Sequence, residues 1–300
     1  MTTNSFSTPS PKKLWLAAIK PPMYSVAIMP IIVGTSIAFQ ETKLYNGLIF
    51  STFLLSAIGI LAWLNLSNDV FDSETGIDKN KAHSVVNLTG NKSLVFWLSN
   101  LLLVLGIGGI VAIAFWQENS TVLVIILGCC FLGYTYQGPP FRLGYQGLGE
   151  FICFFTFGPM AISAAYYAQT ASFSRESIAA SFVIGVTTTI ILFCSHFHQV
   201  ADDLAAGKKS PIVRLGTEKG SRVLTGLTLS IYLITAMGII WGLYPLHTAL
   251  IFLSLPWGWN LIRHVQKYHA QPQTVSNSKF LAVNLHFISG ILFSIGYLWS

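Results

Sequence analysis

Residues 47–72 decide the fold, and they read GLIFSTFLLSAIGILAWLNLSNDVFD. The segment 47–66 is almost wholly apolar. At about 1.5 Å per helical residue it is long enough to cross a hydrocarbon core of about 30 Å. Four polar side chains then close the stretch, namely Asn65, Asn68, Asp69 and Asp72. The stretch therefore predicts a membrane helix that ends in a cluster of amide and carboxylate side chains.

The rest of the chain repeats the apolar part of this pattern. Hydrophobic residues make up 53% of the 300 residues and charged residues only 9%, against about 25% charge in soluble domains. This composition excludes an ordinary soluble protein and predicts an all-α fold, a polytopic membrane helix bundle of about nine transmembrane helices. We expect a polar cytoplasmic tail at 1–20 and a single membrane-embedded domain at 21–300. The expected spans lie near 23–39, 47–66, 94–116, 121–136, 151–168, 178–197, 223–243, 246–262 and 280–299.

The basic residues predict the orientation of the bundle, because short basic loops stay on the cytoplasmic side. If nine spans are threaded in order, only Lys43 and Arg175 of the 17 Lys and Arg residues fall on the far side, leaving 15 on the side of the N-terminus. The N-terminus is thus predicted to be cytoplasmic. The net charge of +6 is explained by topology, and no nucleic-acid partner is predicted.

The first acidic cluster follows the second predicted span. If that helix continues, Asn65, Asp69 and Asp72 share one face at spacings of four and seven residues, with Asn68 beside them. Carboxylates grouped at a membrane surface repel one another unless a cation neutralises them. Mg²⁺ is such a cation, because it takes oxygen ligands and keeps room for phosphate oxygens. The alternative is that these side chains only end the helix in headgroup water.

A second polar cluster follows the sixth predicted span, at the same membrane face. On a continued helix Gln199 and Asp203 would be neighbours, with Asp202 adjacent, and Lys208, Lys209 and Arg214 come next. One metal-diphosphate site lined by both clusters is the economical interpretation. The Gly/Pro-rich connection between them carries Arg142, which could clamp an oxyanion, and tyrosines that either face a carbocation or anchor at the interface.

Three motifs resemble those of the UbiA-type membrane prenyltransferases. They are Asn65-x-x-Asn68-Asp69-x-x-Asp72, the Tyr-rich Gly-Pro loop at 134–150, and Asp203-x-x-x-Gly207-Lys208. The stretches around Lys81 and around His196 resemble the naphthoate branch of cyanobacteria and plastids. The resemblance covers nearly the whole chain.

The resemblance implies a Mg²⁺-dependent site with residue roles taken from matching positions. The first metal arm would be Asn65, Asp69 and Asp72, and Asp203 would belong to the second. Many members have an Asp where this chain has Gln199, so Asp202 is a candidate replacement. The implied metal ligands are Asn65, Asp69, Asp72, Asp202 and Asp203. The implied catalytic residues are Asp69, Asp72, Asp203 and Arg142, and the diphosphate-binding residues are Asn65, Asn68, Lys81, Arg142, Lys208 and Lys209.

The resemblance further implies a substrate pair and a location. A phytyl group, or a similar prenyl group, would pass from its diphosphate to 2-carboxy-1,4-naphthoquinone or 1,4-dihydroxy-2-naphthoate. Carbon dioxide and pyrophosphate would be released, as in phylloquinone biosynthesis in a cyanobacterial-type inner or thylakoid membrane. Homogentisate, 4-hydroxybenzoate and chlorophyllide are alternative acceptors, and a longer chain for menaquinone is an alternative tail. We expect His83, His196 and His198 to make structural hydrogen bonds rather than to transfer protons.

Two other classes of protein fit parts of the sequence. A transporter also pairs Asp residues, but its ion sites lie near the bilayer midplane, whereas these clusters lie at one face. A structural membrane subunit would explain the helices and the basic loops. It would not explain why the chain keeps two acidic clusters at the membrane, where burying charge costs free energy.

Overall fold

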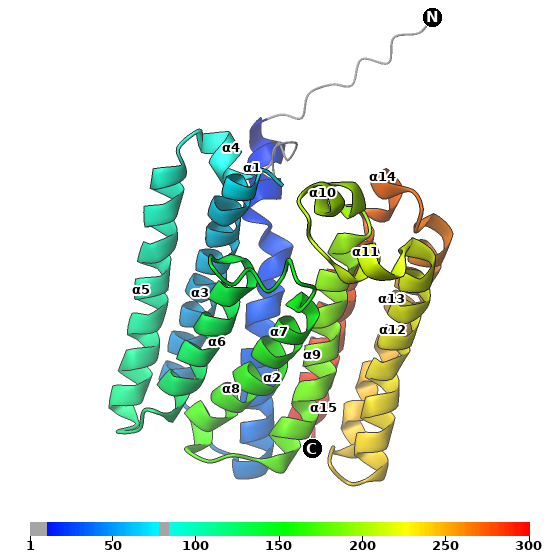
Figure 1. Ribbon diagram of the computed structural model, residues 1–300. Helices are drawn as coiled ribbons and strands as arrows, with labels where there is room; N and C mark the ends of the chain where they lie inside the picture. The colour runs from blue at the N-terminus through cyan, green and yellow to red at the C-terminus, as the bar shows by residue number, and fades with distance from the viewer. Residues whose placement is uncertain (1–10, 78–83) are drawn as a thin grey trace, which may run out of the picture.

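The computed structural model describes residues 11–77 and 84–300, and every regular element in these ranges is a helix that joins one elongated bundle (Figure 1). The elements are α1 (Pro11–Ile19), η1 (Pro21–Tyr24), α2 (Ser25–Thr42), α3 (Gly47–Thr75), α4 (Val85–Thr89), α5 (Lys92–Trp116), α6 (Thr121–Gln137), α7 (Gly149–Phe155), η2 (Thr156–Met160), α8 (Ala161–Thr170), α9 (Arg175–His196), α10 (Val200–Ala205), α11 (Pro211–Leu215), α12 (Thr217–Ile240), η3 (Leu246–Ser254), α13 (Leu255–Tyr268), α14 (Pro272–Val275) and α15 (Ser278–Leu298).

The predicted fold class is confirmed, but the predicted count of nine spans is not. Within the described ranges, seven helical segments are long and apolar enough to cross a membrane. The apolar helix α6 is shorter. The predicted span at 246–262 consists of the 3₁₀ segment η3 followed by α13, and α13 carries Arg263 and Lys267 on its later turns. The polar side chains of α13, among them Asn260, Arg263 and Lys267, make this rod less apolar than the other spans.

Two further segments differ from a plain helix or a plain tail. The rod predicted at 151–168 contains the π-helical turn η2 between α7 and α8, and Pro159 lies inside that turn. Proline lacks the N–H that an α-helix needs, and π turns of this kind are frequent at functional sites. The expected polar tail contains the helix α1, which packs against α4.

Burial divides the bundle into a centre and a periphery. The most apolar window of α9 is 78% buried inside the protein, whereas that of α5 is only 22% buried. The main core joins residues of α2, α9, α12 and α15, while α3 and α5 pack mainly on each other at one side. The exposed apolar faces of α5 are therefore available to lipid, and α9 serves as the central support for neighbouring elements.

The ends of the helices that carry the acidic clusters lie at one end of the bundle. In Figure 1, α1, α4, α10 and α14 lie at the end of the molecule opposite the C-terminus. The C-terminus of α3 and the C-terminus of α9 point to this end. Both clusters can consequently reach the same membrane face, which one shared site requires.

We expect labelling with a membrane-impermeant thiol reagent to find this end in the cytoplasm. Asn87→Cys and Glu218→Cys replace exposed residues at the acidic end, and Lys43→Cys replaces an exposed residue at the opposite end. The first two should be labelled from the cytoplasmic side and the third only from the other side, because the basic residues are so unevenly distributed. Labelling of Asn87→Cys and Glu218→Cys from opposite sides would contradict a single shared site.

Candidate active site

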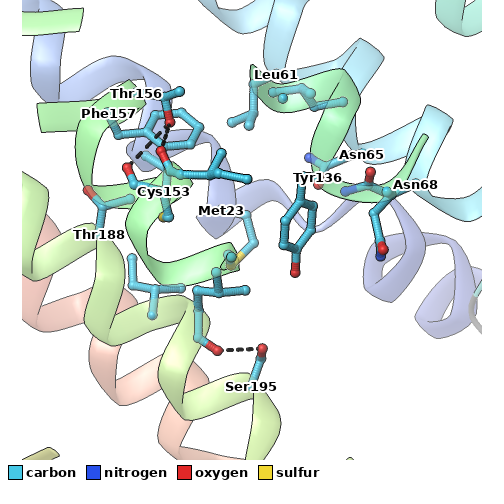
Figure 2. Close-up of a pocket in the computed structure, with 18 of the residues that line it drawn as sticks. Met23, Leu61, Asn65, Asn68, Tyr136, Cys153, Thr156, Phe157, Thr188 and Ser195 are labelled. Carbon is cyan, nitrogen blue, oxygen red and sulfur yellow. Dashed lines mark hydrogen bonds between the residues drawn. The ribbon is translucent and has the colours of Figure 1, made fainter. Parts of the chain in front are cut away.

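A cavity of about 480 Å³ opens among α2, α3, α6, α7, α9 and α10 and reaches both acidic clusters. Figure 2 shows Asn65, Asn68 and Tyr136 on one side of it, and Cys153, Thr156 and Thr188 on another. One face of α3 lines the cavity from Phe53 to Asp72. At about 1.5 Å per residue this face is about 28 Å long. The cavity therefore combines a polar mouth with a long apolar channel.

The first acidic cluster is buried at the mouth. Asp69 is 2% exposed and Asp72 is 9% exposed. Asp69 Oδ2 accepts a hydrogen bond of 2.8 Å from the backbone N–H of Val85, at the start of α4. The helix α3 extends nine residues beyond the predicted end at 66, to Thr75, and is capped by Gly76 at φ 75°. This extension places both carboxylates on the continuous helical face that their spacing predicted.

Two side chains from the α6 end and the following loop hold Asp72. Gln137 Nε2 donates to both carboxylate oxygens of Asp72, at 3.0 and 3.2 Å, and the Tyr145 hydroxyl donates to Oδ1 at 3.3 Å. The same hydroxyl lies 2.8 Å from Thr75 Oγ1. Burial and the negative charge of Asp72 raise the pKa of Tyr145, which keeps the phenol a donor. Asp72 is thus fixed in orientation by neutral donors.

The second cluster is organised around Asp203, which is fully buried. Its Oδ2 lies 3.3 Å from His196 Nδ1 and its Oδ1 lies 3.6 Å from Lys208 Nζ. Burial alone would raise the pKa of Asp203, but the neighbouring imidazole of His196 and the charge of Lys208 lower the pKa below its usual value. Asp203 is therefore held as an anion at neutral pH.

The chain between the sixth span and Asp203 differs from the predicted continuous helix. The helix α9 ends at His196, and the separate short helix α10 begins at Val200, with Gln199 as its N-cap. The backbone N–H of Asp203 still donates to Gln199 O at 2.8 Å. Both residues line the cavity together with Asp202, although Asp202 is exposed. The separate helix α10 thus contributes Asp202 and Asp203 to the lining of the cavity.

The other predicted site residues divide into three groups. Asn65, Asn68 and Lys208 line the cavity. Within the described part of the chain, Arg142 and Lys209 are not among the lining residues; Arg142 lies 3.4 Å from Glu74, and Lys209 is exposed. Lys81 lies outside the described residues.

The donor set fits Mg²⁺ only when a substrate supplies further ligands. Among residues 11–77 and 84–300, no three His, Cys, Asp or Glu side chains converge into a metal-binding group. Buried Asp69 and Asp72 nevertheless provide hard oxygen donors, and the amide nitrogen of Asn65 is buried without a hydrogen-bond partner. Mg²⁺ is usually held by one or two carboxylates together with phosphate oxygens and water. The residues present fit this second kind of site.

The sequence analysis considered the loop tyrosines only as carbocation or interface residues, and it did not assign a role to the other lining or supporting residues. Gln137 and Tyr145 support Asp72, while Glu150 contacts His196 from the first turn of α7. Tyr136, Lys20 and Lys279 line the cavity. The position of Gln137 directly before Gly-Pro-Pro at the basic face was a usable signal. The contact between Glu150 and His196 joins residues 46 positions apart, so no local pattern revealed it.

Comparison with known proteins agrees with this geometry. The model of the UbiA prenyltransferase family matches residues 27–290. The chain is 61% identical to the 2-carboxy-1,4-naphthoquinone phytyltransferase of Synechocystis, over 98% of this chain and 96% of that protein. It is 44% identical to the chloroplastic enzyme of the same name from Arabidopsis thaliana, over 96% of this chain and 77% of that protein.

The fold comparison gives the same result at lower sequence identity. A UbiA homologue from Archaeoglobus fulgidus, whose structure was determined bound to GPP and Mg²⁺, superposes with a TM-score of 0.59 at 17% identity. The match covers 96% of this chain and all of that chain. With the family model spanning most of the sequence, the conclusion is direct: this chain belongs to the UbiA prenyltransferase family.

Proposed function

We propose that this protein transfers a phytyl group from phytyl diphosphate to 2-carboxy-1,4-naphthoquinone or its reduced form, 1,4-dihydroxy-2-naphthoate. The observation that carries the proposal is one cavity that joins two buried carboxylate arms to an apolar channel. The names of the two relatives that are 61% and 44% identical support the choice of substrates. The membrane would be a cyanobacterial-type inner or thylakoid membrane, with the N-terminus in the cytoplasm.

The polar mouth would bind the diphosphate of the donor. Asp69 and Asp72 would hold Mg²⁺ from α3, with Asn65 beside them, and Asp203 would contribute from α10. When bound, Mg²⁺ supplies Lewis-acid neutralisation of the charge that develops on the leaving pyrophosphate. Lys208 adds a fixed positive charge at the same place, since its ammonium already lies at the cavity wall.

The apolar channel would hold the tail and protect the reacting allylic carbon. Phe53, Leu61 and Phe157 line it, so the tail would be buried against aromatic and aliphatic side chains. A carbocation that forms near the mouth needs an environment from which water is excluded. The side chain of Tyr136 lines the cavity (Figure 2), and its ring could stabilise such a cation.

The overall substitution balances without an external oxidant or reductant. The bond between the allylic carbon and the diphosphate oxygen breaks, and pyrophosphate leaves with that electron pair. The ring carbon that carries the carboxylate forms the new carbon–carbon bond, and the bond to the carboxylate breaks with release of carbon dioxide. The electron pair of that bond stays with the ring, so the ring keeps its redox state.

A panel of substrates tests this proposal. Purified protein in lipid vesicles with Mg²⁺ should prenylate the carboxylated naphthalenoid ring and leave homogentisate, 4-hydroxybenzoate and chlorophyllide unchanged. Phytyl and geranylgeranyl diphosphates should both be accepted, with longer chains slower. A polar ring needs matched hydrogen bonds, whereas one methylene in an apolar channel changes binding by only about 1 kcal/mol. Prenylation of homogentisate or chlorophyllide alone would replace the proposed acceptor while keeping prenyl transfer.

A further inference from the structure

His196, the last residue of α9, lies between two carboxylates beside the cavity mouth. Its Nε2 is 3.3 Å from Glu150 Oε1, and its Nδ1 is 3.3 Å from Asp203 Oδ2. The side chains are strongly buried, with exposed fractions of 3% for His196, 13% for Glu150 and 0% for Asp203. A single imidazole therefore links α7, α9 and α10.

The local sequence explains how Glu150 reaches this position. Glu150 lies in the first turn of α7, which packs against α9. A Cβ at Gly149 would lie 2.6 Å from a ring carbon of Tyr136, so only glycine lets α7 begin this close to the ring. Because α7 begins close to Tyr136, Glu150 in its first turn lies beside His196 at the end of α9.

Each ring nitrogen lies within ion-pair distance of one carboxylate, although His196 Nδ1 and the oxygens of Glu150 and Asp203 form no hydrogen bond of normal geometry. A neutral imidazole has one N–H and can donate to only one carboxylate, whereas an imidazolium donates to both. Lys208 Nζ, which lies 3.6 Å from Asp203 Oδ1, adds a basic group to the same buried cluster. Breaking such a buried group is costly, because removal of one partner leaves an uncompensated charge. His196 and Lys208 thus approach different oxygens of the Asp203 carboxylate.

We propose that Glu150 and His196 are positioning residues that orient the Asp203 carboxylate for binding the metal-diphosphate group of the donor. The inference rests on the proposed function, since it assigns Asp203 to that group. Partners that orient a ligating side chain commonly change metal affinity or activity by about 10- to 100-fold when they are replaced. The competing explanation is that the imidazole merely fastens three helices together.

Two substitutions of His196 separate these explanations, because each keeps a donor at one nitrogen position. The amide of Asn lies near the position of Nδ1, so His196→Asn retains a donor toward Asp203. The amide of Gln reaches the position of Nε2, so His196→Gln retains a donor toward Glu150. Both remove one helix-to-helix contact, but only His196→Gln releases Asp203. Glu150→Gln is a third variant that keeps its shape and removes the charge.

The measurement is binding of a non-reactive donor, the S-thiolodiphosphate of phytol, to the full chain in detergent micelles. Calorimetry with Mg²⁺ and with chelator gives two Kd values, and their ratio reports the gain in affinity due to Mg²⁺. His196→Gln should reduce this gain about tenfold or more, and Glu150→Gln should reduce it less. His196→Asn should keep most of it. Melting temperatures of all variants are recorded in the absence of ligand.

His286→Asn is the matched control for loss of a buried imidazole. His286 is fully buried and contacts Thr187 Oγ1 at 2.9 Å and Ser25 O at 3.2 Å, and it is not among the described residues that line the cavity. This variant should melt at a lower temperature, but Mg²⁺ should increase its affinity for the donor as much as in the wild-type protein. If His196→Gln and His196→Asn behave in the same way as this control, the positioning role is wrong. If Mg²⁺ does not increase the affinity of the wild-type protein for the donor, the proposed function itself is wrong.

Discussion

Asp72→Asn should lower kcat by about 100-fold or more while the protein still inserts and folds. The carboxylate is buried at the cavity mouth, where its charge serves a metal and a leaving diphosphate rather than packing. Asparagine keeps the shape and retains an oxygen that can accept from Gln137 and Tyr145, which hold Asp72 in place. The loss should therefore appear in turnover with saturating phytyl diphosphate and not in the melting temperature. Asp69→Asn should behave in the same way.

Glu74→Gln provides the control on the same helix. Glu74 is exposed and lies 2.8 Å from Lys92 and 3.4 Å from Arg142. Exposed ion pairs of this type contribute at most about 1 kcal/mol, which corresponds to a factor of about five, so turnover should change by less than about fivefold. Full activity of both Asp variants would show that the carboxylates of Asp69 and Asp72 do not bind the metal. A collapse of the melting temperature in those variants would show that the carboxylates serve the fold.

Removal of divalent cations should abolish turnover, and added Mg²⁺ should restore it. The carboxylates of Asp69 and Asp72 together place negative charge beside the position proposed for a diphosphate. Without a cation, that arrangement repels the substrate instead of binding it. The measurement is initial rate in chelator, then during titration with Mg²⁺ and with Ca²⁺. Ca²⁺ should restore binding better than turnover, because it is larger and less strict in geometry.

A chelated protein that keeps its full rate would contradict this expectation. A control for chelator damage is the melting temperature, which should stay the same with and without chelator. The reason is that Asp72 accepts hydrogen bonds from Gln137 and Tyr145, and that Asp203 lies within ion-pair distance of His196 and Lys208.

The first acidic arm could be predicted from sequence because its information is local. The apolar run of α3 sets the helix, and the spacing of Asn65, Asp69 and Asp72 sets their common face. Only the length was underestimated. The helix runs on to Thr75 because polar residues at a membrane surface still form good helical hydrogen bonds until Gly76 ends it at positive φ.

The second arm was harder to predict because its geometry depends on tertiary contacts. The chain bends after His196, so Gln199 caps a new helix instead of extending the old one. The partners of Asp203 come from α9 and from the loop after α10, and Glu150 comes from α7. A periodic pattern reports which residues share a helix face, but it does not report which helices meet at their ends.

For Arg142 the sequence indicated a suitable residue type but not the partner of its side chain. Its loop follows α6 and lies at the acidic end of the bundle, as predicted. Its guanidinium lies beside Glu74 on the exposed surface of α3. The nearby Gln137, which has no charge, reaches the buried Asp72 instead. A catalytic role for Arg142 remains a prediction that Arg142→Gln would test.

The most direct test of the central claim is a stoichiometry measured in one reaction. Purified protein in lipid vesicles is given Mg²⁺, phytyl diphosphate and the naphthalenoid acceptor labelled with carbon-14 in its carboxylate. Pyrophosphate, labelled carbon dioxide and prenylated ring are then counted over time. The account predicts that all three appear in equal amounts from the start. A prenylated ring that keeps its label, or pyrophosphate released without any prenylated naphthalenoid product, would contradict it.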